Sequence, residues 1–320
     1  MPKNLTKIIV AGIIVVLGLL PIVVRGPFTL HVLFTIFYFI ILTCSTRFIL
    51  ITGHLNLAHP AFVGVGAYAT AVLGLRYGVS FWLTIPVGIL LTILLAGGIG
   101  SITLGLKGAY FFLVTFAFSE IVRLFLSNYF IEILGGLTGL VNIPHPSITI
   151  PYLFKIPLSS KVHYYYIGLI FMLASLFIMY RLEKSRFGQV LHAIGQNMDL
   201  SRSIGINIFR YKLIAFIIGA SFASVVGSLF APFNRVISPG EFGVPLGTLI
   251  LVYLIIGGAG SFSGSIIGVC VLVPLSTFIL APLGPYNLLF LGLALIIVLI
   301  FFRDGLVGIP QRLFAKNERL

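Results

Sequence analysis

The sequence predicts an all-α integral membrane protein, a single transmembrane domain over residues 1–320 with about ten (eight to ten) transmembrane helices. Three observations predict this class. Hydrophobic residues make up 59% of the 320-residue chain and charged residues only 8%, against about 25% charge in soluble domains. The mean hydropathy is +1.17. Long charge-free windows recur along the chain, and one connection, at about 182–210, is distinctly polar and basic.

Ten spans follow from the apolar windows, because a crossing helix needs roughly 20 apolar residues. In chain order they are Ile8–Val24, Leu30–Leu50, Ala61–Leu75, Phe81–Leu104, Ala109–Leu126, Val162–Tyr180, Lys212–Ala231, Val244–Ile256, Gly264–Leu280 and Asn287–Phe302. The first span is expected to be uncleaved, since no small-residue cleavage site follows it and Pro21 and Arg25 intervene.

The third and eighth segments are short and rich in glycine, so either is a candidate for a re-entrant or broken helix, within 57–75 and 244–264. Non-helical backbone survives at membrane depth only beside protein or a water-lined cavity. Both segments are therefore expected inside the bundle. The window Phe242–Phe302 is 61 residues long, which is enough for three crossings, and Gly257–Gly264 is its predicted interior break.

Lysine and arginine orient the chain through the positive-inside rule. With both termini in the cytoplasm, fourteen cations fall inside and five fall outside: Arg25, Arg76, Lys155, Lys161 and Arg235. The net charge of +13 follows from this distribution, so no nucleic-acid partner is predicted. The basic connection at about 182–210, between spans six and seven, becomes the one large cytoplasmic loop. Its residues Leu191–Ser203 suit a short helix that Gly205 would end.

The connection at about 128–161 is the longest external loop, and its glycines and prolines oppose a long helix. A plain connector and a contact surface are both open for it. Small residues at helix-packing spacing indicate close helix contacts within one bundle, with a homodimer face as the alternative. These residues are Gly219, Ala223 and Gly227, and then Gly260, Gly264 and Gly268.

Catalytic chemistry is not predicted. Glycine is never followed by lysine, so the chain has no nucleotide-binding Walker sequence. His54 and His59 have no cysteine or carboxylate nearby to complete a metal site, and no cofactor is expected. Cys44 and Cys270 lie in apolar windows and predict no disulfide framework.

Two groups of polar residues in apolar surroundings are candidates for a substrate route. Glu120 and Arg123 lie three residues apart on one face of the fifth span, where a buried pair clamping a neighbouring helix is favoured over a route lining. His54, Asn56 and His59 precede or open the third span. They are equally suited to lining a route or to hydrogen-bonding adjacent helices.

Ordered motifs give the sequence a family resemblance. They are Thr52–Tyr68 (TGHLNLAHPAFVGVGAY), Gly108–Arg123 (GAYFFLVTFAFSEIVR), Gly135–Gly139 (GGLTG), Phe187–Ile194 (FGQVLHAI), Ile204–Asn207 (IGIN), Tyr211–Leu213 (YKL) and Gly257–Gly268 (GGAGSFSGSIIG). In this order they resemble the M-type permease of the high-affinity branched-chain amino acid ABC importers. The family's coupling loop usually carries an arginine where His192 stands.

The resemblance implies a permease subunit in a prokaryotic plasma (inner) membrane. Its implied partners are a homologous second permease, two cytoplasmic ABC ATPases, an external solute-binding protein, an amino acid substrate and the lipid bilayer. ATP hydrolysis would belong to the partner ATPases. The residues implied at the ATPase-coupling loop are Gly188, His192, Asp199, Arg202, Gly205 and Asn207.

Other functions compete with this interpretation. An ion-coupled secondary transporter usually needs several carboxylates at membrane depth, and only Glu120 is predicted there. A channel or a membrane-embedded enzyme would need a ring or cluster of polar groups that the sequence lacks. Among ABC permeases, urea or short amides are alternative substrates.

Overall fold

The computed structural model describes residues 12, 15–21, 26–106, 108–150, 154–157, 160–280, 286, 289–290, 292–293, 296 and 305–308. The predicted first and tenth spans, Ile8–Val24 and Asn287–Phe302, lie largely outside the described residues. Both termini lie outside them altogether.

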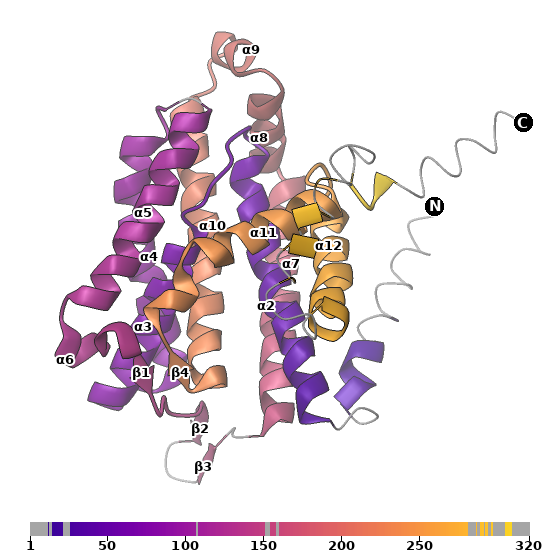
Figure 1. Ribbon diagram of the computed structural model, residues 1–320. Helices are drawn as coiled ribbons and strands as arrows, with labels where there is room; N and C mark the ends of the chain where they lie inside the picture. Colours follow the sequence, from indigo (N-terminus) through magenta and orange to yellow (C-terminus); the bar gives the residue numbers. More distant parts are fainter. Residues whose placement is uncertain are drawn as a thin grey trace, which may run out of the picture.

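The described chain is a bundle of apolar α-helices (Figure 1). Its long helices are α2 (Pro27–Leu50), α3 (His59–Tyr77), α4 (Phe81–Thr103), α5 (Ala109–Asn128), α7 (Lys161–Lys184) and α10 (Ile208–Asn234). Five of them, all except α3, are long and apolar enough to cross a membrane. This confirms an all-α membrane protein, while the count of ten spans stays a prediction.

The third predicted span is one continuous helix, α3, of 19 residues, so it is not broken. It begins where Pro60 pre-sets a helical backbone angle, and it ends at Gly78, whose φ of +62° suits a residue without a Cβ. Eleven of its residues are buried, which agrees with its predicted place inside the bundle.

The helix α10 lies at the centre of the bundle and packs on α2, α3 and α4. Its small residues make this possible. A Cβ on Gly227 would collide with the backbone of Val63 in α3, and a Cβ on Gly66 would collide with the backbone of Ser224. The predicted small-residue face of α10 is therefore used for contacts within the chain.

The eighth and ninth predicted spans form a bent pair. The helix α11 (Val244–Gly257) meets α12 (Phe262–Pro274) at 114°, and a π-helical turn, Leu275–Leu280, continues α12. The bend confirms the predicted glycine break. With 14 residues, α11 is too short to cross alone, so the pair forms either one broken span or a re-entrant loop. We call this bend, Gly258–Ser261, the glycine elbow.

Short strands and helical turns gather at one end of the bundle, called here the strand end (Figure 1). They are α6 (Ile131–Leu134), a 3₁₀ turn (Gly136–Thr138), β1 (Leu140–Val141), β2 (Ser147–Ile150), β3 (Phe154–Pro157), β4 (Val236–Ile237) and a second 3₁₀ turn, η2 (Pro239–Phe242). The strands form two antiparallel pairs, β1 with β4 and β2 with β3. The connection at 128–161 is thus partly folded against its own chain.

The opposite end, called here the loop end, carries α8 (Arg186–Gln196) and α9 (Met198–Ser203) (Figure 1). The outer faces of α4 and α5 expose large apolar side chains such as Leu94 and Ile121, which are 65% and 64% exposed. Such faces suit contact with lipid or another membrane subunit.

Candidate functional site

A buried polar segment joins α2 to α3 and contains three of the candidate route residues. His54, Asn56 and His59 are all buried. Asn56 Oδ1 accepts the Ala58 N–H at 2.8 Å, and Asn56 Nδ2 donates to His59 Nδ1 at 3.0 Å. These bonds fix the turn that leads into α3.

His59 has a partner on each ring nitrogen. Because the Asn56 amide is the donor to Nδ1, the ring proton belongs on Nε2, which lies 3.2 Å from Ser45 Oγ of α2. Gly219 of α10 lies against the ring, and a Cβ there would be 3.6 Å from His59 Cε1. His59 therefore connects α3 to α2 beneath α10, and its part in a substrate route stays a prediction.

His54 faces a buried lysine at the start of α10. Lys212 Nζ lies 3.5 Å from His54 Nε2 and 3.4 Å from Met198 Sδ in α9. Burial, and then the Lys212 charge, lower the pKa of His54, so its ring is neutral and Nε2 can accept from the ammonium. Among the described residues no carboxylate forms an ion pair with Lys212. This cation links the polar segment to the loop end.

The loop between α7 and α10 contains two helices, so the single helix predicted over Leu191–Ser203 is wrong. The chain breaks at Asn197, which is extended (φ −156°, ψ 108°). Asn197 Oδ1 accepts the Leu200 N–H at 3.0 Å and caps α9. Asparagine readily bonds to nearby backbone in this way, which favours a cap over a helix interior.

The predicted helix end is correct, because α9 ends at Ser203, just before Gly205. Gly205 has a φ of +84°, in the left-handed region where a side chain would strain the backbone. Asn207 then caps α10, because its Oδ1 accepts the Arg210 N–H at 3.0 Å. Both residues give the loop a defined shape.

The helix α8 is seated on the bundle through glycines. A Cβ on Gly188 would collide with the Glu183 backbone at the end of α7, and a Cβ on Gly195 would collide with the Ile51 carbonyl after α2. Leu191 and Ile194 are fully buried beneath it. Motion of α8 therefore pushes directly on the ends of α2 and α7.

The tip of the loop faces away from the bundle. Leu200 and Ile204 are 62% and 69% exposed, and the charged residues Asp199 and Arg202 are also exposed. An apolar tip with charges beside it, left uncovered by the described residues, is typical of a protein–protein contact surface.

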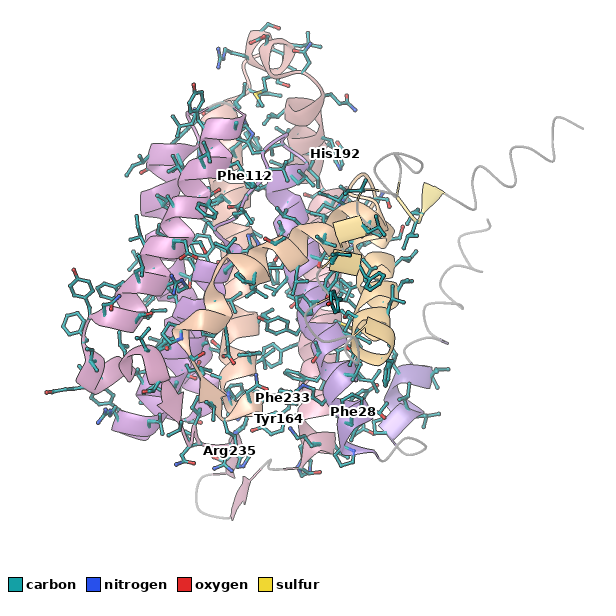
Figure 2. All side chains as sticks on the ribbon, viewed as in Figure 1. Phe28, Phe112, Tyr164, His192, Phe233 and Arg235 are labelled. Atoms are coloured by element: carbon teal, nitrogen blue, oxygen red, sulfur yellow. The ribbon has the colours of Figure 1, made fainter. Side chains whose placement is uncertain are left out.

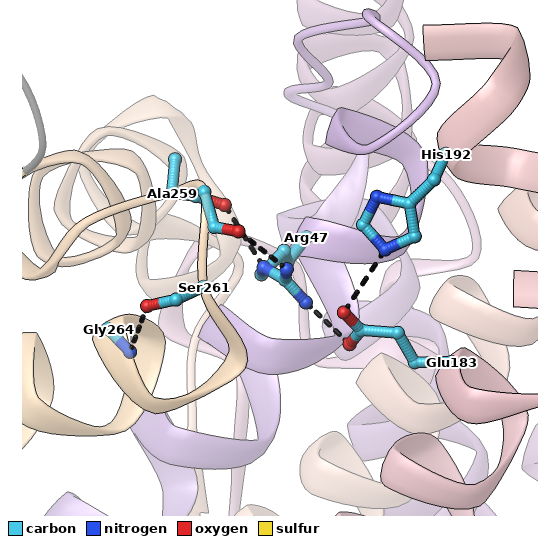
Figure 3. Close-up of polar contacts among 7 residues, drawn as sticks. Arg47, Glu183, His192, Ala259, Ser261 and Gly264 are labelled. Atoms are coloured by element: carbon cyan, nitrogen blue, oxygen red, sulfur yellow. Dashed lines mark hydrogen bonds and ion pairs between the residues drawn. The ribbon is translucent and has the colours of Figure 1, made fainter. Parts of the chain in front are cut away.

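A buried arginine connects this loop to the glycine elbow (Figure 3). Arg47, near the end of α2, donates from Nη1 to Glu183 Oε2 at 2.5 Å. Its Nε and Nη2 donate to the carbonyls of Ala259 and Gly260 at 3.0 and 3.1 Å. Glu183 Oε1 lies 3.3 Å from His192 Nε2 on α8. One guanidinium thus joins α2, α7 and the elbow, and Glu183 extends the link to α8. We call these three side chains the Arg47 hub.

A segment near the C-terminal end of the described residues also holds the elbow. The Leu306 N–H donates to the Ile256 carbonyl at 2.9 Å. A Cβ on Gly305 would be 2.5 Å from Gly258 Cα, so only glycine allows this approach. The elbow is therefore a tightly fixed contact point for several parts of the chain.

Glu120 and Arg123 contact each other, with Arg123 Nε 2.7 Å from Glu120 Oε2. Glu120 Oε1 accepts the Val244 N–H at 3.3 Å, at the start of α11, where the helix dipole favours a carboxylate. This matches the expected clamp between helices. The side chains remain 24% and 29% exposed, however, so the expectation of a buried pair is wrong, because α5 lies at the rim of the described bundle.

Of the Arg47 hub, the sequence pointed only to His192; Arg47, Glu183 and the nearby Lys212 were not singled out as site residues. Arg47 and Glu183 are 136 residues apart, and no spacing rule links them. The available signal was that Arg47 and Lys212 directly border long apolar windows.

Apolar helices around buried polar groups, with a polar loop packed at one end, define a multi-pass membrane protein as the class of this chain. Within the described ranges, no group of three or more His, Cys, Asp or Glu side chains could hold a metal. The family follows from comparison. Residues 28–299 match the family model "Branched-chain amino acid transport system / permease component", and the chain belongs to that family.

Relatives support the assignment. The chain is 30% identical over 286 residues to the high-affinity branched-chain amino acid transport system permease protein LivM of Escherichia coli K12, covering 83% of this chain and 67% of LivM. For LivM of Salmonella typhimurium the identity is also 30%, covering 82% and 65%. The permease LivH of Salmonella typhimurium is 30% identical over 146 residues, 45% of this chain and 47% of LivH. No solved structure gives a significant match.

These matches confirm the predicted family and the predicted class, a transport permease component rather than an enzyme. The chain spans about two thirds of the length of the LivM relatives.

Proposed function

We propose that the chain is one of two membrane-spanning subunits of an ATP-driven importer for branched-chain or similar small apolar amino acids. The printed functions of the LivM relatives support the cargo, and the partial match to LivH supports a homologous second permease. Two ATPases and a solute-binding protein complete the proposed assembly. Urea or short amides are the alternative cargo.

The proposed topology has eight to ten spans in a prokaryotic inner membrane, with both termini in the cytoplasm. The loop end would face the cytoplasm and the strand end the exterior, following the fourteen-to-five distribution of cations. The opposite positions of the α8–α9 loop and the strands support this arrangement (Figure 1).

The Arg47 hub is the observation that supports coupling most directly. In the proposed mechanism the exposed tip at Leu200 and Ile204 docks on an ATPase, and α8 receives its movement. Glu183 and Arg47 then pass the displacement to the glycine elbow, because the guanidinium bonds both. Bending or releasing the elbow would reposition α11 and α12 beside the substrate route. The polar segment at His54, Asn56 and His59 is proposed to form the inner end of that route, and Glu120 and Arg123 to support α11 beside it.

The loop's role can be tested with two matched glycines. Gly205 and Gly78 both have left-handed backbones, and for both a Cβ would meet nothing within 4 Å. Gly205 lies at the loop end and Gly78 at the strand end. Each glutamate substitution strains the backbone by roughly 1 kcal/mol and adds one charge. Gly205→Glu should release the ATPases from the purified permease and abolish ATP-dependent leucine uptake into vesicles, while Gly78→Glu should preserve both.

Equal ATPase retention and equal uptake in the two variants would contradict a coupling role for the loop. Uptake that continues without ATP and follows a proton or sodium gradient would show that the protein is an ion-coupled carrier and not an importer subunit.

A further inference from the structure

A cavity of about 250 Å³ opens near the strand end, between α2, α10, η2 and the start of α11. Sites for drug-sized ligands measure roughly 300–1,000 Å³, so this cavity suits a smaller molecule. Its lining contains none of the residues that the sequence nominated for the substrate route.

The lining combines polar and aromatic side chains. His31 and Asn234 lie near the strand-end termini of α2 and α10, and Glu241 lies in η2. Tyr38 follows His31 by seven residues, which is about 10 Å along the helix. Phe230 lies one turn deeper in α10 than Asn234. A small ligand with both polar and apolar groups matches this lining.

The aromatic wall is held rigidly. Phe233 stacks on Phe34 with ring centroids 3.8 Å apart and on His31 at 5.1 Å. Lys161 Nζ lies 4.4 Å from the Phe233 ring centroid, which adds a cation at the mouth. Figure 2 shows Phe233 at the strand end, far from His192 at the loop end. Rigid walls reduce the entropy lost when a ligand binds.

Glu241 supplies the anionic group. Its Oε2 accepts the Ser238 N–H at 3.3 Å as part of a capping box, which fixes the side chain. Within the described part of the chain no donor bonds the other oxygen, Oε1. A fixed carboxylate oxygen above an aromatic pocket is a suitable acceptor for a primary ammonium group.

The geometry points to this cavity as a binding site for the transported amino acid on the permease itself. The ammonium would bind Glu241, the carboxylate would face His31 and Asn234, and the apolar side chain would lie against Tyr38 and Phe230. This inference rests on the proposed function, and it adds that the permease holds its cargo by chemistry of its own after the binding protein delivers it. Strongly acidic or long basic side chains would not fit the aromatic depth.

A labelling experiment tests the site without requiring transport. In the assembled importer, with Cys44→Ala and Cys270→Ala, a cysteine is placed in the cavity by Thr35→Cys and, independently, by Leu246→Cys. A small maleimide then reports access. Leucine at about ten times its dissociation constant should slow labelling about tenfold at both positions. 3-Methylbutylamine, which keeps the ammonium, should still protect, while 4-methylpentanoate, which lacks it, should not.

The control compares two glutamates at the strand end. Glu241→Gln should abolish protection by leucine, whereas Glu132→Gln, which removes the same charge outside the cavity, should leave it intact. ATP-dependent leucine uptake is measured in the same preparations. Uptake without protection at either cysteine overturns this site and leaves the proposed function standing, whereas protection without any uptake supports the site and counts against the importer. Labelling that responds only to removal of lipid would identify a lipid site instead and overturn the inference.

Discussion

Two carboxylate–guanidinium pairs occur among the described residues, and they differ in what they connect. The Arg47–Glu183 pair is almost fully buried, with side chains 2% and 11% exposed, whereas the side chains of Glu120 and Arg123 are 24% and 29% exposed. The first pair brings together α2, α7 and the glycine elbow, and it reaches α8 through His192. The second joins neighbours on one helix and touches only the start of α11.

The difference shows that the position of an ion pair in the bundle decides how strongly the pair stabilises the fold. A desolvated guanidinium with three acceptors cannot lose its partners without leaving charge or carbonyls unsatisfied in a medium of low dielectric. A pair that its own bundle leaves partly uncovered has room to change partners when a neighbouring helix moves. The Arg47 hub is therefore expected to be rigid, while the Glu120–Arg123 pair is expected to adjust when α11 moves.

The largest effect is expected from Arg47→Met. It leaves Glu183 buried without its cation and the Ala259 and Gly260 carbonyls without donors. Removing one partner of a buried pair costs about 3–5 kcal/mol, so thermal unfolding of the purified permease should shift down strongly. Arg47→Lys keeps the charge but loses the planar fork that reaches several acceptors, and should give an intermediate loss.

The control is Arg76→Met, which removes an exposed arginine whose one side-chain hydrogen bond among the described residues goes to the Glu132 carbonyl at the strand end. It should change the unfolding temperature little. An Arg47→Met protein as stable as Arg76→Met would show that the hub is not a structural connection.

The contrast between the pairs also explains what the sequence could predict. Glu120 and Arg123 were found because a spacing of three places them on one helix face. The exposure of these two side chains could not be predicted, because it depends on where α5 packs. The partner of Arg47 lies 136 residues away, and only the fold brings it close. Long apolar windows predicted the helices, and local glycines predicted the elbow.

Smaller features escaped prediction for related reasons. The break at Asn197 depends on a single side chain that caps α9 instead of continuing the helix. The residues on both sides favour a helix, so the sequence gives little sign of the break. The strands contain two to four residues each; β1 forms through pairing with distant β4, as Leu140 pairs with Ile237, while β2 and β3 form a local hairpin. His54, Asn56 and His59 were predicted to precede or open the third span, and His59 does begin α3, but the contact of Lys212 with His54 was not predicted.

An intermediate effect is expected at the second pair. Glu120→Gln keeps an acceptor for the Val244 N–H, so a double-mutant cycle with Arg123→Gln isolates the charge interaction. Because both side chains are only partly buried, the coupling energy should be about 1 kcal/mol, well below that of the hub. Glu120→Ala, which also removes the acceptor at α11, should destabilise the permease more than Glu120→Gln. Strict additivity of the two glutamine substitutions in thermal unfolding would mean that the charges do not interact.

The smallest effect on stability is expected at His192, where the hub meets α8. The side chain is 43% exposed and contacts Glu183 at 3.3 Å, so His192→Ala should change the free energy of unfolding by only about 0.5–1 kcal/mol. Its effect on coupling should be larger, because it is the side-chain link from Glu183 to α8. The ratio of leucine transported to ATP hydrolysed in vesicles should fall in His192→Ala and recover in His192→Gln, whose amide can still donate to Glu183. Gln189→Ala, on the exposed side of the same helix, provides the matched control. If both alanine variants lower the ratio equally, the link through Glu183 carries no coupling, and the movement of α8 must reach the bundle through its glycine contacts with α7 and the end of α2 instead.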